Sequence, residues 1–150
     1  MEMKRLFYIF VAMVLFLATG CQEKLGQSFP FEGDWHYNYN AEENGVAEDV
    51  WVSFAADGTF EMYQKIGEGA YWFSHGKFTY DSESKVLSGV YSDRYPWKYT
   101  YGISVSGDSL VMTPVELEDY SVTYTRGTIP SEVREKSLPL TKAETVERYL

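Results

Sequence analysis

The feature that most constrains the fold is an alternation of apolar and polar side chains in eight short stretches of this 150-residue chain. Alternation with a period of two places successive side chains on opposite faces of a β-strand, so each stretch predicts a strand with one buried face. Turn-forming residues separate the stretches, and Asp57-Gly58 is typical of a tight hairpin. The predicted strands cover residues 34–40, 49–54, 59–66, 70–80, 86–91, 98–105, 110–113 and 120–126.

Eight short strands at fairly regular spacing indicate an all-β fold, either an antiparallel up-and-down barrel or a two-sheet sandwich. The last stretch places Tyr120, Val122, Tyr124 and Arg126 on one face. An Arg on an apolar face needs a partner, and Trp35 would supply one by stacking if the first and last strands paired. This pairing favours the barrel, which also leaves no exposed sheet edge.

The segment Gly33-Asp34-Trp35 at the start, together with Arg126 at the end, resembles the lipocalin-like (calycin) family. In that family a Gly-x-Trp on the first strand packs against an Arg on the last strand of an eight-stranded barrel. The resemblance covers residues 31–127, and we assign 31–128 to the barrel. It implies that Gly33, Trp35 and Arg126 close one end, and that the other end is an open mouth.

The N-terminal residues 1–20 predict an exported lipoprotein. Lys4-Arg5 precedes thirteen apolar residues, Leu6 to Ala18, which is typical of a signal peptide and too short to span a bilayer as a helix. The following Leu17-Ala18-Thr19-Gly20-Cys21 resembles the bacterial lipobox, which implies a lipid on Cys21. The alternative is a plain secretory signal with an incidental Cys. Cys21 is the only cysteine, so no disulfide can form within the chain.

We therefore expect a protein of the bacterial cell envelope, held on a membrane by its N-terminal lipid. The expected membrane is the outer one, with the periplasmic or surface face left open. Residues 21–30 predict a polar tether. Without residues 1–20, which hold Glu2, Lys4 and Arg5, the formal net charge changes from −9 to −10. Such an acidic chain is a poor partner for nucleic acid.

Connection lengths predict two different barrel ends. The tight connections, around 55–58, 81–85 and 106–109, share one end with Trp35 and Arg126, which we call the base. The longer connections, 41–48, 92–97 and 114–119, share the other end, the mouth. The tether enters at the base, so the mouth is expected to face away from the membrane.

Inward positions near the mouth are the candidate ligand-binding residues. Their apolar and phenolic side chains suit a small hydrophobic or aromatic ligand, and the acidic rim favours a neutral or cationic one. The alternative is that they only fill the core, since eight-stranded barrels are narrow. The candidates are Tyr39, Gln64, Trp72, Tyr91, Tyr99, Met112 and Tyr120, together with Val50.

Two functions stay open at this point. The first is a lipid-anchored carrier or sensor of a small ligand. The second is an interaction or inhibitor module with a filled barrel, which would bind an envelope protein through loops 41–49, 92–97 and 114–119, with Tyr95 and Trp97 as aromatic anchors.

Catalytic and metal-binding motifs are missing from the sequence, so we expect no enzyme, no cofactor and no metal site. Ser82-Glu83-Ser84-Lys85 matches the catalytic motif Ser-x-x-Lys. The other motifs that accompany it in Ser-x-x-Lys enzymes are missing from the sequence, so we attribute the match to chance. His36 and His75 are isolated and face outward. After the barrel, Thr141-Lys142-Ala143-Glu144 resembles a capping box before a short helix to Leu150, and a polar tail is the alternative.

Overall fold

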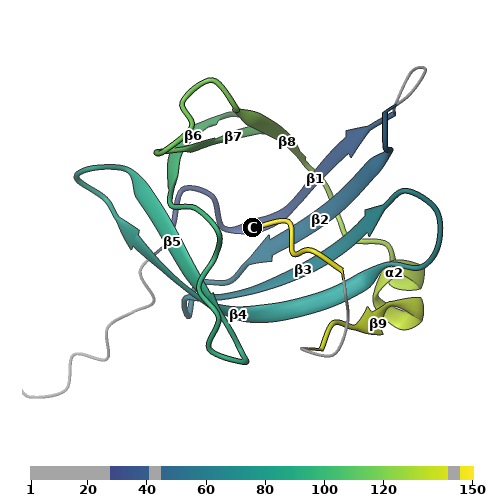
Figure 1. Ribbon diagram of the computed structural model, residues 1–150. Coiled ribbons are helices and arrows are strands. Elements are labelled where there is room, and N and C mark those ends of the chain that lie inside the picture. The colour runs from purple at the N-terminus through teal and green to yellow at the C-terminus, as the bar shows by residue number, and fades with distance from the viewer. Residues whose placement is uncertain (1–27, 41–44, 142–145) are drawn as a thin grey trace, which may run out of the picture.

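The computed structural model describes residues 28–40, 45–141 and 146–150. Eight strands form one antiparallel sheet that closes on itself, which confirms the predicted barrel (Figure 1). The sheet runs in chain order from β1 to β8, and β8 pairs with β1. The strands are β1 (Gly33–Tyr39), β2 (Glu48–Phe54), β3 (Thr59–Ile66), β4 (Trp72–Asp81), β5 (Val86–Tyr91), β6 (Tyr101–Ser106), β7 (Ser109–Pro114) and β8 (Val122–Arg126).

The base is closed by the predicted contact between the first and last strands. Trp35 pairs with Arg126 across β1 and β8, and the guanidinium carbon lies 4.1 Å from the centroid of the buried indole. Arg126 Nη1 donates a hydrogen bond to the main-chain oxygen of Glu32 at 3.0 Å. Gly33 has a φ of +112°, and a Cβ there would lie 2.9 Å from Arg126 Nη1. A side chain at position 33 would therefore be strained and would push the guanidinium off the ring.

Two aromatic residues at the end of the tether, Phe29 and Phe31, pack into the base of the barrel. Phe31 is fully buried, and its main-chain oxygen accepts a hydrogen bond of 2.7 Å from Trp35 Nε1. Phe29, which the sequence assigned to the tether, packs edge-on against Phe78 with 4.9 Å between ring centroids. The end of the tether thus belongs to the barrel's packing. Cys21 and residues 1–27 lie outside the described residues.

Three strands begin later than predicted, each at the mouth end. β4 starts at Trp72, β6 at Tyr101 and β8 at Val122, instead of residues 70, 98 and 120. Before β6, Trp97 turns inward and its main-chain nitrogen donates to Gly89 O at 2.9 Å. Before β8, Tyr120 closes a turn by donating to Leu117 O at 2.9 Å. Before β6 the regular ladder is thus reduced to one isolated bridge, Val90↔Pro96, and before β8 a turn takes the place of strand pairing.

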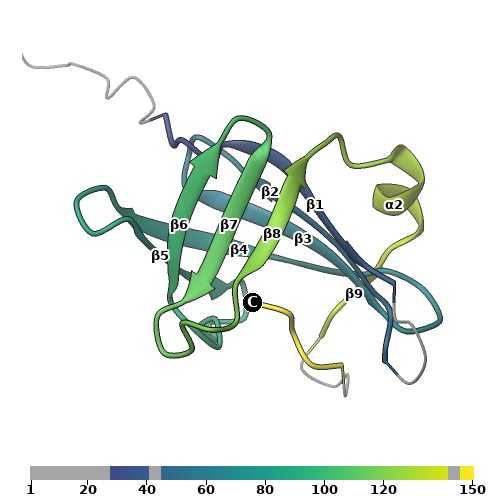
Figure 2. The ribbon, with the colours of Figure 1, turned by 90° about the horizontal axis from the view of Figure 1, so that it is seen from above.

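A short helix lies near the C-terminus, but not where the capping box predicted it. The helix is α2 (Ser131–Lys136), on the outside of the barrel (Figure 2). Residues 142–144 of the predicted capping box lie outside the described residues, and residues 146–150 are not helical. The two-residue strand β9 (Leu138–Pro139) pairs in parallel with the start of β4, a part that β5 does not reach.

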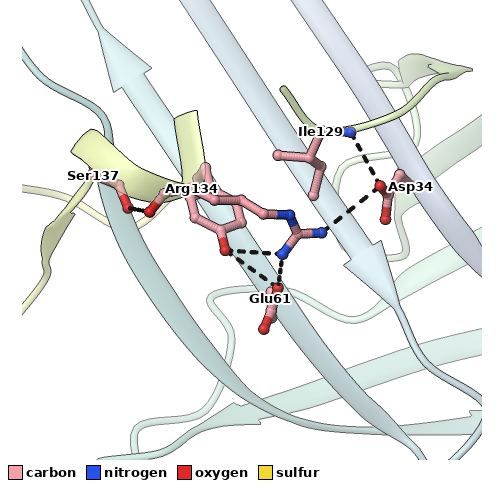
Figure 3. A network of polar contacts seen from close by, with 6 residues as sticks. Asp34, Glu61, Ile129, Arg134 and Ser137 are labelled. Atoms are coloured by element: carbon pink, nitrogen blue, oxygen red, sulfur yellow. Dashed lines mark hydrogen bonds and ion pairs between the residues drawn. The ribbon is translucent and has the colours of Figure 1, made fainter. Parts of the chain in front are cut away.

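The helix α2 is held by a small second core and by one arginine. Val133 is buried with Tyr63 and Ile129. Arg134 Nη1 donates to Glu61 Oε2 at 2.6 Å and to Tyr63 Oη at 3.2 Å, and its Nη2 lies 3.8 Å from Asp34 Oδ2 (Figure 3). The same Asp34 oxygen accepts from the main-chain nitrogen of Ile129 at 3.1 Å. These contacts tie the segment after β8 back to β1 and β3. Within the described residues, no helix has the length and apolar character needed to cross a bilayer.

Candidate binding site at the barrel mouth

The candidate ligand-binding residues divide into interior and rim. Val50, Gln64, Tyr91 and Met112 are buried inside the barrel. Trp72 and Tyr99 are half-buried, and Tyr99 packs against the core.

Tyr39 and Tyr120 do not lie in the interior. They are 49% and 69% exposed. Tyr39 is the last residue of β1, and Tyr120 precedes β8, so neither is held in the inward-facing part of a strand. Tyr39 still pairs with Glu48 of β2, but β8 no longer pairs with β1 at this level. Tyr120 lies in the turn before β8. The parity argument therefore fails for both residues.

The interior between base and mouth is filled by side chains. One continuous cluster runs from Phe31 and Trp35 at the base to Tyr91 and Tyr101 near the mouth. Rings meet edge to face within it, such as Phe60 against Trp97 with centroids 5.0 Å apart. This packing agrees with the narrow interior expected of an eight-stranded barrel.

The chain's own C-terminal segment enters the mouth. We call Val146–Leu150 the tail, and in Figure 1 it ends inside the ring of strands. Leu150 is 2% exposed and belongs to the barrel core. Tyr149 packs against Tyr37 of β1 with 5.9 Å between ring centroids. The mouth is therefore occupied by a peptide.

Gln64 holds the main chain of the tail. It projects inward from β3 and is fully buried. Its Nε2 donates to the main-chain oxygen of Glu147 at 2.7 Å, and its Oε1 accepts from the main-chain nitrogen of Tyr149 at 3.0 Å. A third contact comes from Tyr91 Oη, which donates to the main-chain oxygen of Leu150 at 2.8 Å. A buried amide needs such partners, because an unpaired one would lose its hydration without compensation.

Arg148 of the tail fits between an acid and an aromatic ring. Its guanidinium makes two hydrogen bonds with the Asp93 carboxylate, one of them 3.1 Å long, and its central carbon lies 4.3 Å from the centroid of Tyr91. Both partners of this ion pair are largely shielded from solvent, at 18% and 21% exposure of their side chains. Nearer the surface, Lys98 Nζ donates to Glu147 Oε1 at 2.7 Å.

Burial keeps the mouth phenols neutral. It raises the pKa of Tyr101 to about 12 and raises that of Tyr91 despite the opposing effect of the Arg148 charge. Burial, followed by the neighbouring Tyr124 and the Glu48 carboxylate, raises the pKa of Tyr149. A tyrosine already keeps its proton in neutral solution, and burial extends this range into alkaline solution, so Tyr91 can donate to the tail throughout.

The rim of the mouth carries exposed large hydrophobic side chains. The large hydrophobic residues that stand exposed gather on the mouth loops and at the mouth ends of strands: Tyr39, Val46, Ile66, Val90, Tyr95, Val115, Leu117, Tyr120 and, on the adjoining β9, Leu138. Trp97 was expected among these anchors, and this expectation is wrong. Trp97 is 5% exposed and its ring covers Gly89, where even a Cβ would come within 2.2 Å of it.

Away from the mouth, a depression of about 600 Å³ lies on the outer wall of the barrel between β1, β2 and α2. His36 Nε2 and Asp49 Oδ1 lie 2.7 Å apart, and Tyr71 Oη donates to Asp49 Oδ2 at 2.6 Å. The His36 ring stacks on Trp51 with 3.9 Å between centroids. Both oxygens of the carboxylate are thus engaged within the protein. Among the described residues, no group of three or more His, Cys, Asp and Glu side chains is placed to hold a metal ion.

No protein-family model and no curated protein matches this sequence. Several solved structures are similar, among them the following three. A protein from Bacteroides uniformis has a TM-score of 0.50 and 14% identity, over 65% of this chain and 88% of that one. The lipoprotein YedD from Klebsiella pneumoniae has a TM-score of 0.48 and 10% identity, over 73% and 83%. A predicted lipoprotein from Shewanella oneidensis has a TM-score of 0.44 and 19% identity, over 69% and 100%. The Bacteroides likeness is one of fold.

Of the residues that join the tail to the mouth, Gln64 and Tyr91 were among the candidates, whereas the tail and Asp93 were missed. The sequence placed the tail in a short helix or a polar tail outside the barrel. Asp93 was not singled out, and it binds Arg148. The available signal was Gln64, an inward amide that required a polar partner inside the barrel.

Proposed function

We propose that this chain is a lipid-anchored, lipocalin-like protein of the bacterial cell envelope, and that it acts as a non-catalytic interaction module that binds an envelope protein through the barrel mouth. The observation that carries this proposal is the gathering of exposed large hydrophobic side chains on the mouth loops. Exposed apolar side chains that lie close together mark interaction surfaces, whereas single scattered ones do not.

The charges of the rim indicate the partner's chemistry. Acidic residues alternate with the apolar ones on the mouth loops, including Glu48, Glu68, Glu116, Glu118 and Asp119. A partner surface with apolar side chains and surrounding Lys or Arg would complement this rim. The filled interior supports an interaction module over a carrier, because a carrier needs room for its ligand.

Carriage of a small hydrophobic ligand is a second candidate. A depression of about 400 Å³ lies beside the tail, with Ile66, Lys98 and Tyr99 in its wall. This volume suits a small ligand. Such a ligand would sit between tail and mouth wall, not deep in the barrel.

Orientation follows from the tether. Phe29 and Phe31 pack into the base, so a chain anchored through Cys21 would hold its base toward the membrane and its mouth outward. The tether from Cys21 to Phe29 can extend to no more than about 30 Å. The mouth would then meet other envelope proteins.

Site-specific photocrosslinking in the native host tests the proposal. A photoreactive amino acid is placed at Leu117 or Tyr120 on the rim, and at Ser84 in a base turn as the matched control. We expect one protein adduct of defined mass from both rim positions and none from Ser84, and loss of the adduct when Val115→Asp is added. Adducts from Ser84 alone, or equal adducts from both ends, would contradict the proposal. Native mass spectrometry of the purified protein would reveal a bound small molecule if the second candidate holds.

A further inference from the structure

We infer that the barrel mouth is a peptide-binding site, that the tail is its intramolecular occupant, and that a partner segment with an Arg-aromatic-aliphatic sequence competes with the tail for this site. The inference rests on the proposed function, because it names how the partner protein would dock. It goes further in assigning specific contacts to the backbone and to each side chain of the bound segment.

The first step is that the site recognises a peptide backbone. Gln64 contacts the main-chain oxygen of Glu147 and the main-chain nitrogen of Tyr149, the two groups that flank residue 148. Tyr91 binds the main-chain oxygen of Leu150. These three hydrogen bonds do not depend on the side chains of the occupant, so any extended segment could form them.

The second step is that side-chain contacts select the sequence. Asp93 binds the guanidinium of Arg148 through both oxygens, a geometry that Lys cannot match. Tyr149 lies among the aromatic rings at the mouth, against Tyr37. Leu150 fills the top of the core. The site therefore favours Arg, then an aromatic residue, then an aliphatic one.

The third step is that the tail can leave without opening the barrel. The sheet closes through β1 and β8, and none of its strand pairings involves residues 146–150. A departing tail would expose Leu150, Tyr149 and the buried amide of Gln64, so an empty site would be costly. Exchange with a second peptide would avoid this cost.

The fourth step is the intramolecular advantage of the tail. A tethered ligand acts at an effective concentration in the millimolar range. A free peptide of equal intrinsic affinity would therefore bind the intact protein weakly. Weakening the tail should raise the apparent affinity of the peptide.

The experiment measures the fluorescence anisotropy of a labelled peptide with the sequence of residues 146–150, titrated with the full mature chain. We expect Leu150→Asp, which places a charge in the core, to bind the peptide at least about tenfold more tightly than the wild-type chain. Leu138→Asp changes an exposed leucine and should bind like the wild type. Adding Gln64→Leu to Leu150→Asp should abolish binding, and a peptide with Arg replaced by Gln should bind more weakly.

Two results would overturn the inference. One is a folded Leu150→Asp chain, judged by a cooperative thermal transition, that binds the peptide no better than the wild type. If that variant does not fold, the wild-type chain with ¹³C-labelled leucine methyl groups decides. If the peptide displaces the tail, the NMR signals of the Leu150 methyl groups shift when millimolar peptide is added. Unchanged signals would show that the peptide does not exchange with the tail. Rim crosslinks that persist when the peptide fails would leave the proposed function standing and remove only this inference.

Discussion

At the scale of single residues, the function of the mouth depends on polar groups placed in an apolar interior. Gln64 is the clearest case, because its strand neighbours on the same face are the apolar Met62 and Phe60. Its amide satisfies two main-chain groups of the tail, and the tail in turn satisfies the amide. The Gln64 amide and the tail main chain can both be shielded from water, because each supplies the hydrogen-bond partners of the other.

Replacing Gln64 should therefore destabilise the folded chain. We expect Gln64→Leu to lower the free energy of unfolding by about 1–3 kcal/mol, because the partly buried Glu147 O and Tyr149 N lose their partner. Urea unfolding followed by circular dichroism measures this. Thr79→Val, on the exposed face of β4, is the control and should change stability little. A Gln64→Leu midpoint equal to the wild type would show that the two hydrogen bonds contribute nothing.

The buried phenol of Tyr101 predicts a loss of stability in alkaline solution. Its pKa is raised from 10.0 to about 12 by burial, so the native state holds the proton more tightly than the unfolded state. This contribution is complete below pH 10 and is lost as the pH rises through 12. Tyr101→Phe should show a smaller fall in the free energy of unfolding between pH 10 and 12, measured by urea titration at each pH. The exposed Tyr120→Phe should reproduce the wild-type fall, and a Tyr101→Phe curve parallel to the wild type would refute the assignment.

At the scale of strands and helices, the barrel depends on one contact between its first and last strands. Only Trp35↔Arg126 and His36↔Thr125 pair directly across β1 and β8. Stacking of Arg126 on Trp35 and its hydrogen bond to Glu32 reinforce this short pairing. Period-two alternation predicted the strands, and the anomaly of an inward Arg predicted the closure.

Loss of this cation should weaken the closure. Arg126→Met keeps most of the aliphatic stem but removes the charge and the hydrogen bond to Glu32, and we expect a loss of about 1–2 kcal/mol in the free energy of unfolding. Hydrogen exchange of β1 and β8 should increase more than that of β2 and β3. The exposed Lys77→Met on β4 is the matched control. An equal increase in hydrogen exchange across all strands would show that Arg126 does not act through the pairing of β1 with β8.

A short helix near the C-terminus was predicted and is present, but it lies earlier in the chain than expected, for a reason that belongs to this scale. The capping pattern at Thr141 and the apolar positions Val146, Tyr149 and Leu150 are compatible with a helix, but short helices gain most of their stability from packing. Residues 146–150 lie in the mouth as a non-helical segment, where Leu150 is buried and Gln64 and Tyr91 bind the main chain. The helix instead forms at Ser131–Lys136, where Val133 and Arg134 have partners on β1 and β3.

At the scale of the whole molecule, the two barrel ends have different roles. The base is packed by Phe29 and Phe31 and continues into the tether. The mouth carries the tail and the exposed apolar rim. If Cys21 carries a lipid as proposed, the base would lie toward the membrane and the mouth would be presented to partners.

The anchor itself can be tested directly. Cys21→Ser removes the thiol that would carry the lipid, so we expect the protein to move from the membrane fraction to the soluble fraction and to lose incorporation of labelled palmitate. Acyl chains contribute about 0.8 kcal/mol for each buried CH₂, so their loss should abolish anchoring. Thr19→Ser keeps a small residue in the lipobox and is the control. Incorporation of labelled palmitate that survives Cys21→Ser would reject the lipidation of this residue.

The order of the strands, the closed barrel and the position of its base followed from local alternation and from the unusual placement of Arg126, because strand faces repeat every two residues. What fills the mouth did not follow. Gln64 forms hydrogen bonds with two residues that lie 83 and 85 positions further along the sequence, and Tyr91 forms one with a residue 59 positions further along. No local period encodes such contacts. Only the folded barrel brings the inward amide of Gln64, the hydroxyl of Tyr91 and the tail together, so only the tertiary structure decided that a segment with helical patterning binds in the mouth as a non-helical peptide.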